Sequence, residues 1–355
     1  MVMLAEHYDF VIGGDPDRDT IDLAVLDTGA GRVQAHLADS ADGDGYRRML
    51  AWADEHAAGR RIWALEGTGS FAAGLAVFLA EAGETVVEVG ALKRARGAKN
   101  DRIDAIRAAR QALSRDEHGA PRAGGLREAL RMVFACREGV LVSRTKAINE
   151  LKSLIVVAPE QLRAQLRGRS LAVQLNRIEQ LHERETAPVE LLLSVFSLQS
   201  VAARVRFLST QLTELDPQLL TLIKQHPTGP ALLAEPGVGP VVAAQLLISW
   251  SHHGRVRNDA AFASLAGVAP IEASSGQRSR HRLNRGGDRA LNRALHTVAI
   301  TRMRCHPETR AYEVRRSAEG KTHRDIRRSV KRALARRLYR RIEAAVRLHQ
   351  FAEAA

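Results

Sequence analysis

The chain has 355 residues, 45% hydrophobic and only 4% aromatic, which allows two or three domains with mainly aliphatic cores. Its two cysteines, Cys136 and Cys305, lie far apart, which excludes a disulfide framework and fits a reducing cytoplasm. The first residues lack the pattern of a signal peptide, and no apolar run approaches the ~18 residues of a membrane span.

Charge is unevenly distributed along the sequence. The formal net charge is +13, but residues 1–90 carry −10 and residues 91–355 carry +23. A large basic region favours a polyanionic partner, because each phosphate that a protein neutralises releases counterions. The alternative is a solubilising surface with the arginine bias of a GC-rich coding sequence. The scarcity of aromatic residues favours recognition of phosphates and duplex shape over base stacking.

The first hundred residues alternate strand and helix patterns. Strands are expected over YDFVIGGD (8–15), TIDLAVLD (20–27), RVQAHLA (32–38), RIWALEGTG (61–69) and ETVVEVG (84–90), and helices over 42–57 and 70–83. Three antiparallel strands followed by parallel ones is the order of a ribonuclease-H-like fold. We therefore predict an α/β domain over residues 1–120.

Four acids occupy the positions where a ribonuclease-H-like fold binds metal. Asp15 ends the first strand, Glu66 ends the fourth, and Asp101 and Asp104 are three apart on one face of a later helix. Clustered carboxylates repel one another unless cations neutralise them, and such oxygen ligands suit Mg²⁺ or Mn²⁺. Sites of this kind act on phosphodiesters.

Three of these acids also have a simpler explanation. Asp15 could be a turn residue with Asp17 and Asp19 beside it, Glu66 could precede the GTGS turn, and Asp101 could cap a helix. The coincidence of four acids with four expected positions favours the metal site.

Residues 121–225 are predicted to be helical. Apolar residues recur at heptad spacing over 126–154 and 201–222, as in a coiled-coil hairpin or a plain helical bundle. Arg137 and Arg144 fall on the apolar seam, and Pro217 should kink the second helix. These departures leave both architectures open.

Residues 226–355 read as a mostly helical domain with basic surfaces. Gly237 and Gly239 lie between two helical halves, like a helix-hairpin-helix that approaches a phosphate, although a turn without a ligand is equally compatible. The terminal helix could bind RNA or pack on its apolar stripe. Six arginines are expected to contact nucleic-acid phosphates: Arg278, Arg280, Arg282, Arg285, Arg289 and Arg293.

Ser274-Ser275-Gly276 lies between an apolar helix and this basic stretch. A serine there could attack phosphorus, although the tripeptide by itself is more typical of a turn. The absence of a GxSxG elbow excludes an esterase-type triad.

Six stretches together resemble the DEDD transposases of insertion sequences, also called bridge-RNA-guided recombinases. They are Asp15 with the AVLD strand after it, LEGTGS (65–70), KNDRIDA (99–105), EPGVGP (235–240), LAGVAPIEASSGQ (265–277) and HRLNRGGDRALNRALH (281–296). The resemblance covers nearly the whole chain in the same order. One departure is Pro16-Asp17-Arg18-Asp19, where the family usually has basic residues or histidine.

The resemblance implies a RuvC-like N-terminal domain whose acids match Asp15, Glu66, Asp101 and Asp104. It implies a C-terminal transposase domain whose serine nucleophile matches Ser275, with Ser274 as the alternative. It also implies a homo-oligomer, a dimer or tetramer, in which the acids of one protomer meet the serine of another. The expected partners are target and donor DNA and a guide or bridge noncoding RNA, without a membrane.

The resulting expectation is a DNA transposase or recombinase that exchanges strands in the bacterial cytoplasm, at the nucleoid. The alternatives are a metal-dependent RuvC-like nuclease or junction resolvase that needs only the acids, and an inactive nucleic-acid-binding protein that keeps the fold.

Overall fold

The computed structural model describes residues 4–90, 101–115, 118–122, 124–182, 187–272 and 281–354. By its internal contacts the chain divides into two units. One comprises Met1–Glu128 and Leu246–Ala355, and the other comprises Ala129–Gln245. The boundaries predicted at residues 120 and 225 follow sequence patterns, whereas these units follow contacts, so the three-part division stays a prediction.

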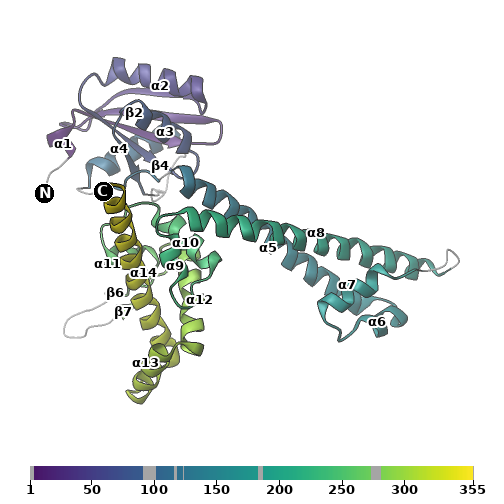
Figure 1. The fold of residues 1–355 in the computed structure, drawn as a ribbon. Helices are drawn as coiled ribbons and strands as arrows, with labels where there is room; N and C mark the ends of the chain where they lie inside the picture. Colours follow the sequence, from purple (N-terminus) through teal and green to yellow (C-terminus); the bar gives the residue numbers. More distant parts are fainter. Residues whose placement is uncertain are drawn as a thin grey trace. The chain divides into compact units, whose positions relative to one another are not determined.

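A five-stranded sheet forms the N-terminal part of the first unit (Figure 1). Its strands are β1 (Phe10–Pro16), β2 (Thr20–Asp27), β3 (Val33–Ser40), β4 (Arg61–Glu66) and β5 (Val86–Val89). The order is β3-β2-β1-β4-β5. Strand β2 is antiparallel to both β1 and β3, and β4 is parallel to both β1 and β5. This mixed α/β arrangement is the one expected from the sequence and is consistent with a ribonuclease-H-like domain.

Helices cover both faces of the sheet. Side chains that alternate along a strand point to opposite faces, so each strand contributes to two separate cores. Ile12, Trp63 and Leu65 belong to the core formed with α2 (Gly43–His56) and α3 (Ala73–Glu81). Val11, Ile62 and Ala64 belong to the core formed with α4 (Asp101–Leu113). A short helix, α1 (Leu4–His7), precedes β1.

Helix α4 lies unusually close to β1. Its buried face consists only of alanines, namely Ala105, Ala108, Ala109 and Ala112. A Cβ atom on Gly13 of β1 would lie 2.1 Å from the carbonyl oxygen of Ala105 and 2.5 Å from the nitrogen of Ala109. Small side chains on both elements therefore let the helix backbone approach the strand directly.

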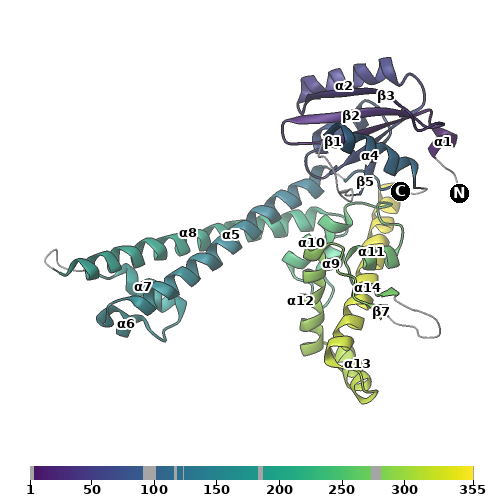
Figure 2. The same ribbon diagram turned by 180° about the vertical axis from the view of Figure 1, so that it is seen from behind.

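The second unit is a helical bundle. It contains most of α5 (Gly125–Val157), all of α6 (Glu160–Leu166), α7 (Leu171–Glu179), α8 (Val189–Gln225) and α9 (Gly229–Leu233), and the first half of α10 (Pro240–Trp250). Figures 1 and 2 show α5 and α8 running side by side. One core joins α5 to α8, with Leu151, Leu166, Ile178 and Leu198 fully or almost fully buried.

The arginines on the predicted apolar seam have polar partners across the bundle. Arg137 Nε donates to Asp216 Oδ1 at 2.5 Å, and Arg144 Nε donates to Ser209 Oγ at 2.7 Å. Pro217 lies inside α8 and does not end it, since the helix continues to Gln225.

Among the described residues, α8 is long and apolar enough to cross a membrane by length and composition alone. The expectation that no apolar run would approach this length is corrected for this helix. A third of that stretch is buried, because Leu191, Val195 and Leu198 are part of the core of the bundle.

The C-terminal part of the first unit is mostly helical. After the second half of α10 come α11 (Asp259–Leu265), β6 (Ile271–Glu272), β7 (His281–Arg282), α12 (Arg289–Cys305), α13 (Pro307–Ala318) and α14 (His323–Ala354). Helix α14 packs against α11, α12 and α13. Its buried side chains include Ile326, Val330, Leu334, Leu338 and Ile342, the apolar stripe that the sequence contains.

Two glycines hold the start of α12 against the end of α11. Gly267 and Gly287 both have positive φ, +64° and +89°, and a Cβ atom on Gly287 would lie 2.9 Å from the nitrogen of Gly267. The next residue, Asp288, caps α12 by accepting from the nitrogens of Ala290 and Leu291, and it also accepts from Ser249 Oγ. The LAG and NRGGD motifs thus form one packed turn.

Candidate active site

Asp15 and Glu66 are neighbours at one edge of the sheet. Gly14 pairs with Leu65 in the parallel register of β1 and β4, so the next residue on each strand lies at the same level. Alternation places Asp15 on the same face as Gly13, and Glu66 on the same face as Ala64, which is the face that α4 covers. Both acids are half-buried.

Helix α4 brings the other two acids to this edge. Asp101 and Asp104 lie in its first turn. Asp101 precedes Ala105 by one helical turn, and Ala105 is the residue whose carbonyl touches Gly13, two positions before Asp15. Acidic side chains are favoured in a first turn because of the helix dipole. The close packing of Gly13 on Ala105 therefore fixes the position of the helical turn that carries Asp101 and Asp104.

The negative charges of the other three acids, and that of Asp22, act on Asp15. Its pKa is raised from 3.8 to about 6, first by burial and then by the negative charges of Asp104, Glu66, Asp101 and Asp22. A carboxyl group surrounded by like charges holds its proton more tightly. The four predicted acids therefore lie close enough together for Glu66, Asp101 and Asp104 to affect the ionisation of Asp15.

In this structure the four carboxylates are not arranged as a set of metal ligands. Arg107 Nη1 donates to Asp104 Oδ1 at 2.6 Å, so a cationic side chain of the same helix already pairs with this acid. Within the described ranges, no three His, Cys, Asp or Glu side chains are grouped so that they could hold a metal ion. The donor set and its accumulated negative charge fit Mg²⁺ or Mn²⁺, while Asp104 is paired with Arg107 in this structure.

A polar pair that was not predicted from the sequence lies beside these acids. Asp22 lies opposite Asp15 in the antiparallel register of β1 and β2. His36 Nε2 of β3 lies 3.0 Å from Asp22 Oδ1, and the two side chains are 21% and 17% exposed. The alternation of TIDLAVLD could have identified Asp22, because it places this acid on the same face as Ala24 and Leu26.

The loop after Glu66 is held by contacts with residues 118–122. Gly67 has φ +67°, and Thr68 is 2% exposed and accepts from the nitrogen of Arg122 at 3.2 Å. A Cβ atom on Gly69 would lie 2.3 Å from Arg122 Cδ. The GTG sequence therefore shapes the turn that ends β4 at its acid.

Glu88 of β5 anchors this arrangement. Its carboxylate lies 3.3 Å from Arg122 Nε and 3.2 Å from Arg255 Nη2, and its side chain is 11% exposed. Its nitrogen also donates to the carbonyl of Gly119 at 2.6 Å. One acid thus connects segment 118–122, which holds the GTG turn, with the segment after α10.

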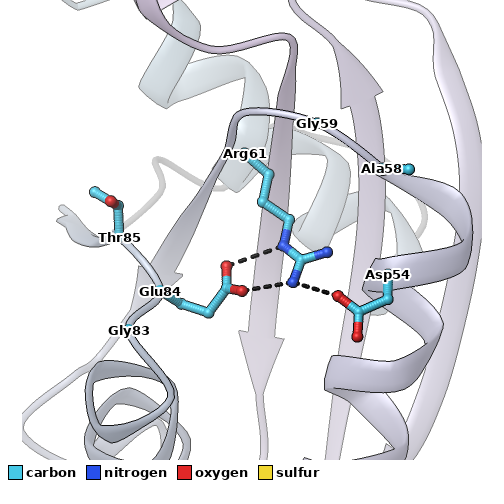
Figure 3. Close-up of a pocket in the computed structure, with 7 residues that line it drawn as sticks. All are labelled: Asp54, Ala58, Gly59, Arg61, Gly83, Glu84 and Thr85. Carbon is cyan, nitrogen blue, oxygen red and sulfur yellow. Dashed lines mark hydrogen bonds and ion pairs between the residues drawn. The ribbon is translucent and has the colours of Figure 1, made fainter.

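A second charged cluster lies at the other end of β4 and lines a pocket (Figure 3). Arg61 donates to Glu84 and to Asp54 Oδ1, the latter at 2.6 Å, and Trp63 Nε1 donates to Glu84 Oε2 at 2.8 Å. These contacts lower the pKa of Glu84, with the Arg61 hydrogen bond as the main cause. Because Arg61 pairs with both carboxylates, this cluster joins α2, β4 and the segment before β5, and it is separate from the acids at Glu66.

The predicted serine region is only partly described. Ser274, Ser275, Arg278 and Arg280 lie outside the described residues. The strands that flank them pair in antiparallel fashion, with Ile271 opposite Arg282 and Glu272 opposite His281. The remaining predicted arginines are exposed: Arg282, Arg285, Arg289 and Arg293.

The turn between α9 and α10 contains the two predicted glycines. Gly237 has φ +81°, and a Cβ atom on Gly239 would meet open space. Helix α9 has only five residues, and a helix-hairpin-helix that binds phosphate stays a prediction.

Two family models match separate parts of the chain. A model for DEDD transposases of the IS110 type, described as "Transposase", matches residues 12–158. A second model, described as "Transposase IS116/IS110/IS902 family", matches residues 230–314. The first match contains the four acids, and the second contains the serine tripeptide and the arginines around it.

Two curated relatives come from insertion elements. The "Insertion element IS110 uncharacterized 43.6 kDa protein" of Streptomyces coelicolor is 38% identical over 126 residues, which cover 35% of this chain and 31% of that protein. The "Insertion element IS900 uncharacterized 42 kDa protein" of Mycobacterium paratuberculosis is 25% identical over an alignment that covers 90% of this chain and 88% of that protein. Both models and both relatives agree, and the chain belongs to the DEDD-type transposases of insertion sequences.

Proposed function

We propose that this protein is the transposase of an insertion sequence and cuts and rejoins DNA strands with the acids of its sheet edge as a Mg²⁺ or Mn²⁺ site. The observation that carries this proposal is the position of Asp15, next to Glu66 in the sheet and under the charges of Asp101 and Asp104. Carboxylates gathered in this way are costly without a cation, and membership of the transposase family supports DNA as the substrate.

In the proposed site Asp15, Glu66, Asp101 and Asp104 would hold the cation. When bound, a divalent ion would polarise the scissile phosphate and stabilise charge on the attacking and leaving oxygens. Asp104 pairs with Arg107 in the structure, so its role as a ligand requires it to exchange this partner. Arg107 would then be available to a phosphate oxygen.

The nucleophile in this proposal is Ser275, with Ser274 as the alternative. Its Oγ attacks phosphorus, so that a serine–phosphate bond forms while the bridging P–O bond of the DNA breaks. The serine proton is released, and the leaving oxygen of the DNA takes up a proton. The freed hydroxyl of a partner strand then attacks the phosphoserine, which restores serine and joins the exchanged strands.

The proposed partners follow from the family resemblance and the basic composition. Target and donor DNA bind with a bridge RNA whose pairing selects the sequences, while the protein contacts mainly backbone. A homo-oligomer would combine the acids of one protomer with the serine of another.

A second candidate function uses the acids alone. A RuvC-like nuclease or junction resolvase would need the edge of β1 and β4 together with α4, and its products would be hydrolysed ends. The gathering of all four acids within the N-terminal 128 residues supports this alternative equally.

The decisive experiment looks for a covalent protein–DNA adduct. Full-length protein is mixed with labelled DNA that carries the element's ends and target, with RNA transcribed from the element's flanks, and with Mg²⁺. Products are separated under denaturing conditions, with EDTA as the metal control. The variants are Ser275→Ala, Ser274→Ala and Asp15→Asn, and exposed Asp17→Asn is the matched control for the acids.

Strand transfer by serine predicts a Mg²⁺-dependent adduct and joined product, both lost in Ser275→Ala and Asp15→Asn but kept in Asp17→Asn. Hydrolysed ends without an adduct, unchanged by both serine substitutions, would assign the nuclease function instead. A full yield of product from Asp15→Asn would refute the metal site.

A further inference from the structure

Two helices of the C-terminal part place basic side chains face to face. Helix α12 carries Asn292 and His296, and helix α14 carries Arg327 and Lys331. Each pair is four residues apart and therefore lies on one face of its helix. The two helices pack against each other, and all four residues are half-buried.

Lys331 is held in place by a neutral partner. Its Nζ donates to Asn292 Oδ1 at 2.5 Å, and Asn292 Nδ2 donates in turn to the carbonyl of Ala266 at 2.7 Å. Asn292 is thus fixed by the turn after α11 and positions the ammonium group. An amide oxygen orients a lysine without cancelling its charge.

The basic groups of this cluster repel one another. Burial lowers the pKa of Lys331, and the charge of Arg327 lowers it further. Burial likewise lowers the pKa of His296, followed by the charges of Lys331 and Arg327. Lys331 and His296 both therefore lie close enough to Arg327 to be affected by its charge.

In the described part of the chain, no carboxylate pairs with this positive charge. Among the described residues, no ion pair involves Arg327, Lys331 or His296. The acid nearest to them in sequence, Asp325, accepts instead from Thr322 Oγ1 at 2.6 Å and from Arg328 Nη1 at 3.0 Å. Half-buried positive charges without a counter-charge are costly unless an anion joins them.

We propose that Arg327 and Lys331, with His296 beside them, form a binding site for a phosphodiester group of a nucleic-acid backbone. The planar fork of arginine can bind two phosphate oxygens, while lysine supplies a fixed point charge. The Asn292 contact holds that charge in position before the phosphate arrives. This inference rests on the proposed function only for the identity of the polyanion.

The test measures how salt weakens binding. Wild-type protein, Arg327→Gln and Lys331→Gln bind a labelled DNA duplex in one arm and a structured RNA in the other, over a series of NaCl concentrations. The matched control is Arg332→Gln, which removes one exposed charge from the same helix. Each lost phosphate contact is expected to reduce the slope of log K against log salt by about one.

A second arm tests the cluster without nucleic acid. Inorganic phosphate, compared with chloride at equal ionic strength, should raise the unfolding temperature of the wild type and Arg332→Gln more than that of Arg327→Gln or Lys331→Gln. This arm remains informative even if the protein cuts no DNA, so failure of the site and failure of the proposed function are distinguishable.

The outcomes separate cleanly. A reduced slope in both cluster variants supports the site, and the arm in which it occurs assigns the phosphate to DNA or to RNA. Unchanged slopes in both arms, or an equal reduction in Arg332→Gln, would overturn it. A phosphate response that is the same in all four proteins would overturn it as well.

Discussion

Asp22 lies directly opposite Asp15 across β1 and β2, and its negative charge is one of those that raise the pKa of Asp15. A row of polar side chains therefore crosses four adjacent strands on the face that α4 covers. It runs from His36 through Asp22 and Asp15 to Glu66. Only the last two were recognised in the sequence as metal ligands, and the first two are joined to each other by their own contact.

Asp22→Asn should show whether Asp22 affects metal binding through its charge or by coordinating the metal itself. We expect Mn²⁺ binding to weaken by about tenfold, because the substitution removes charge near the site but no proposed ligand. Asp15→Asn should instead abolish measurable binding. Titration calorimetry of both full-length variants is the measurement, and equal loss in the two would show that Asp22 is itself a ligand.

The metal-free protein should lose stability as pH rises through the range in which Asp15 ionises. The folded-state pKa, about 6, lies above the reference value of 3.8, so between these values the native state binds more protons than the unfolded state. The free energy of unfolding therefore falls over this window. Asp15→Asn should flatten that decline and exceed the wild type in stability at neutral pH.

Urea denaturation in EDTA between pH 4 and pH 8 measures this effect, the range being set by the two values of the Asp15 pKa. Exposed Asp17→Asn is the control and should keep the wild-type profile. A decline of the same size in Asp15→Asn would contradict the assignment of the pH dependence to Asp15.

Gly13→Ala should damage both stability and the proposed metal site. The added Cβ would meet the backbone of α4 at Ala105 and Ala109, so the helix that carries Asp101 and Asp104 must move. Overpacking of this kind costs about 1–3 kcal/mol of the free energy of unfolding. Urea denaturation and Mn²⁺ titration measure the two effects.

Gly29→Ala is the matched control, because its added Cβ would meet only Asp27 Oδ1, at an ordinary 3.7 Å. We expect nearly wild-type stability and metal binding from this variant. Equal behaviour of the two glycine variants would show that the contact between β1 and α4 does not position the acids.

Glu88→Gln should loosen the loop that follows Glu66. The substitution removes the charge that Arg122 and Arg255 share, and losing charged hydrogen bonds at this nearly buried position costs about 1.5–3 kcal/mol. Hydrogen exchange at Gly67 and Thr68 should accelerate. Exposed Glu81→Gln is the control, and unchanged exchange in Glu88→Gln would refute the connection.

The sequence predicted the sheet well because strand periodicity and turn residues are local signals. Asp15 and Glu66 could be placed because both end apolar strands, and Asp101 and Asp104 because their spacing fits one helix face. His36 could not be paired with Asp22 from the sequence, since that contact depends on the register of β3. The ion pair between Arg107 and Asp104 was equally hidden, because Arg107 was considered only as part of the basic surroundings.

Contacts between distant segments were harder to predict than the helices. Helix α8 runs through Pro217, the residue at which the sequence predicted a kink within the second helix. Glu88, Arg122 and Arg255 are distant in sequence, and no sequence pattern predicts that the Glu88 carboxylate pairs with both arginines.

The close approach of Gly267 and Gly287 affects how conserved residues in related sequences should be interpreted. A side chain at either position would collide with backbone belonging to the other motif, so the two sites constrain each other whatever the chemistry nearby. If evolution preserves LAG and NRGGD together, their joint persistence would record a steric requirement. Such invariance alone would be a poor guide to which residues touch DNA.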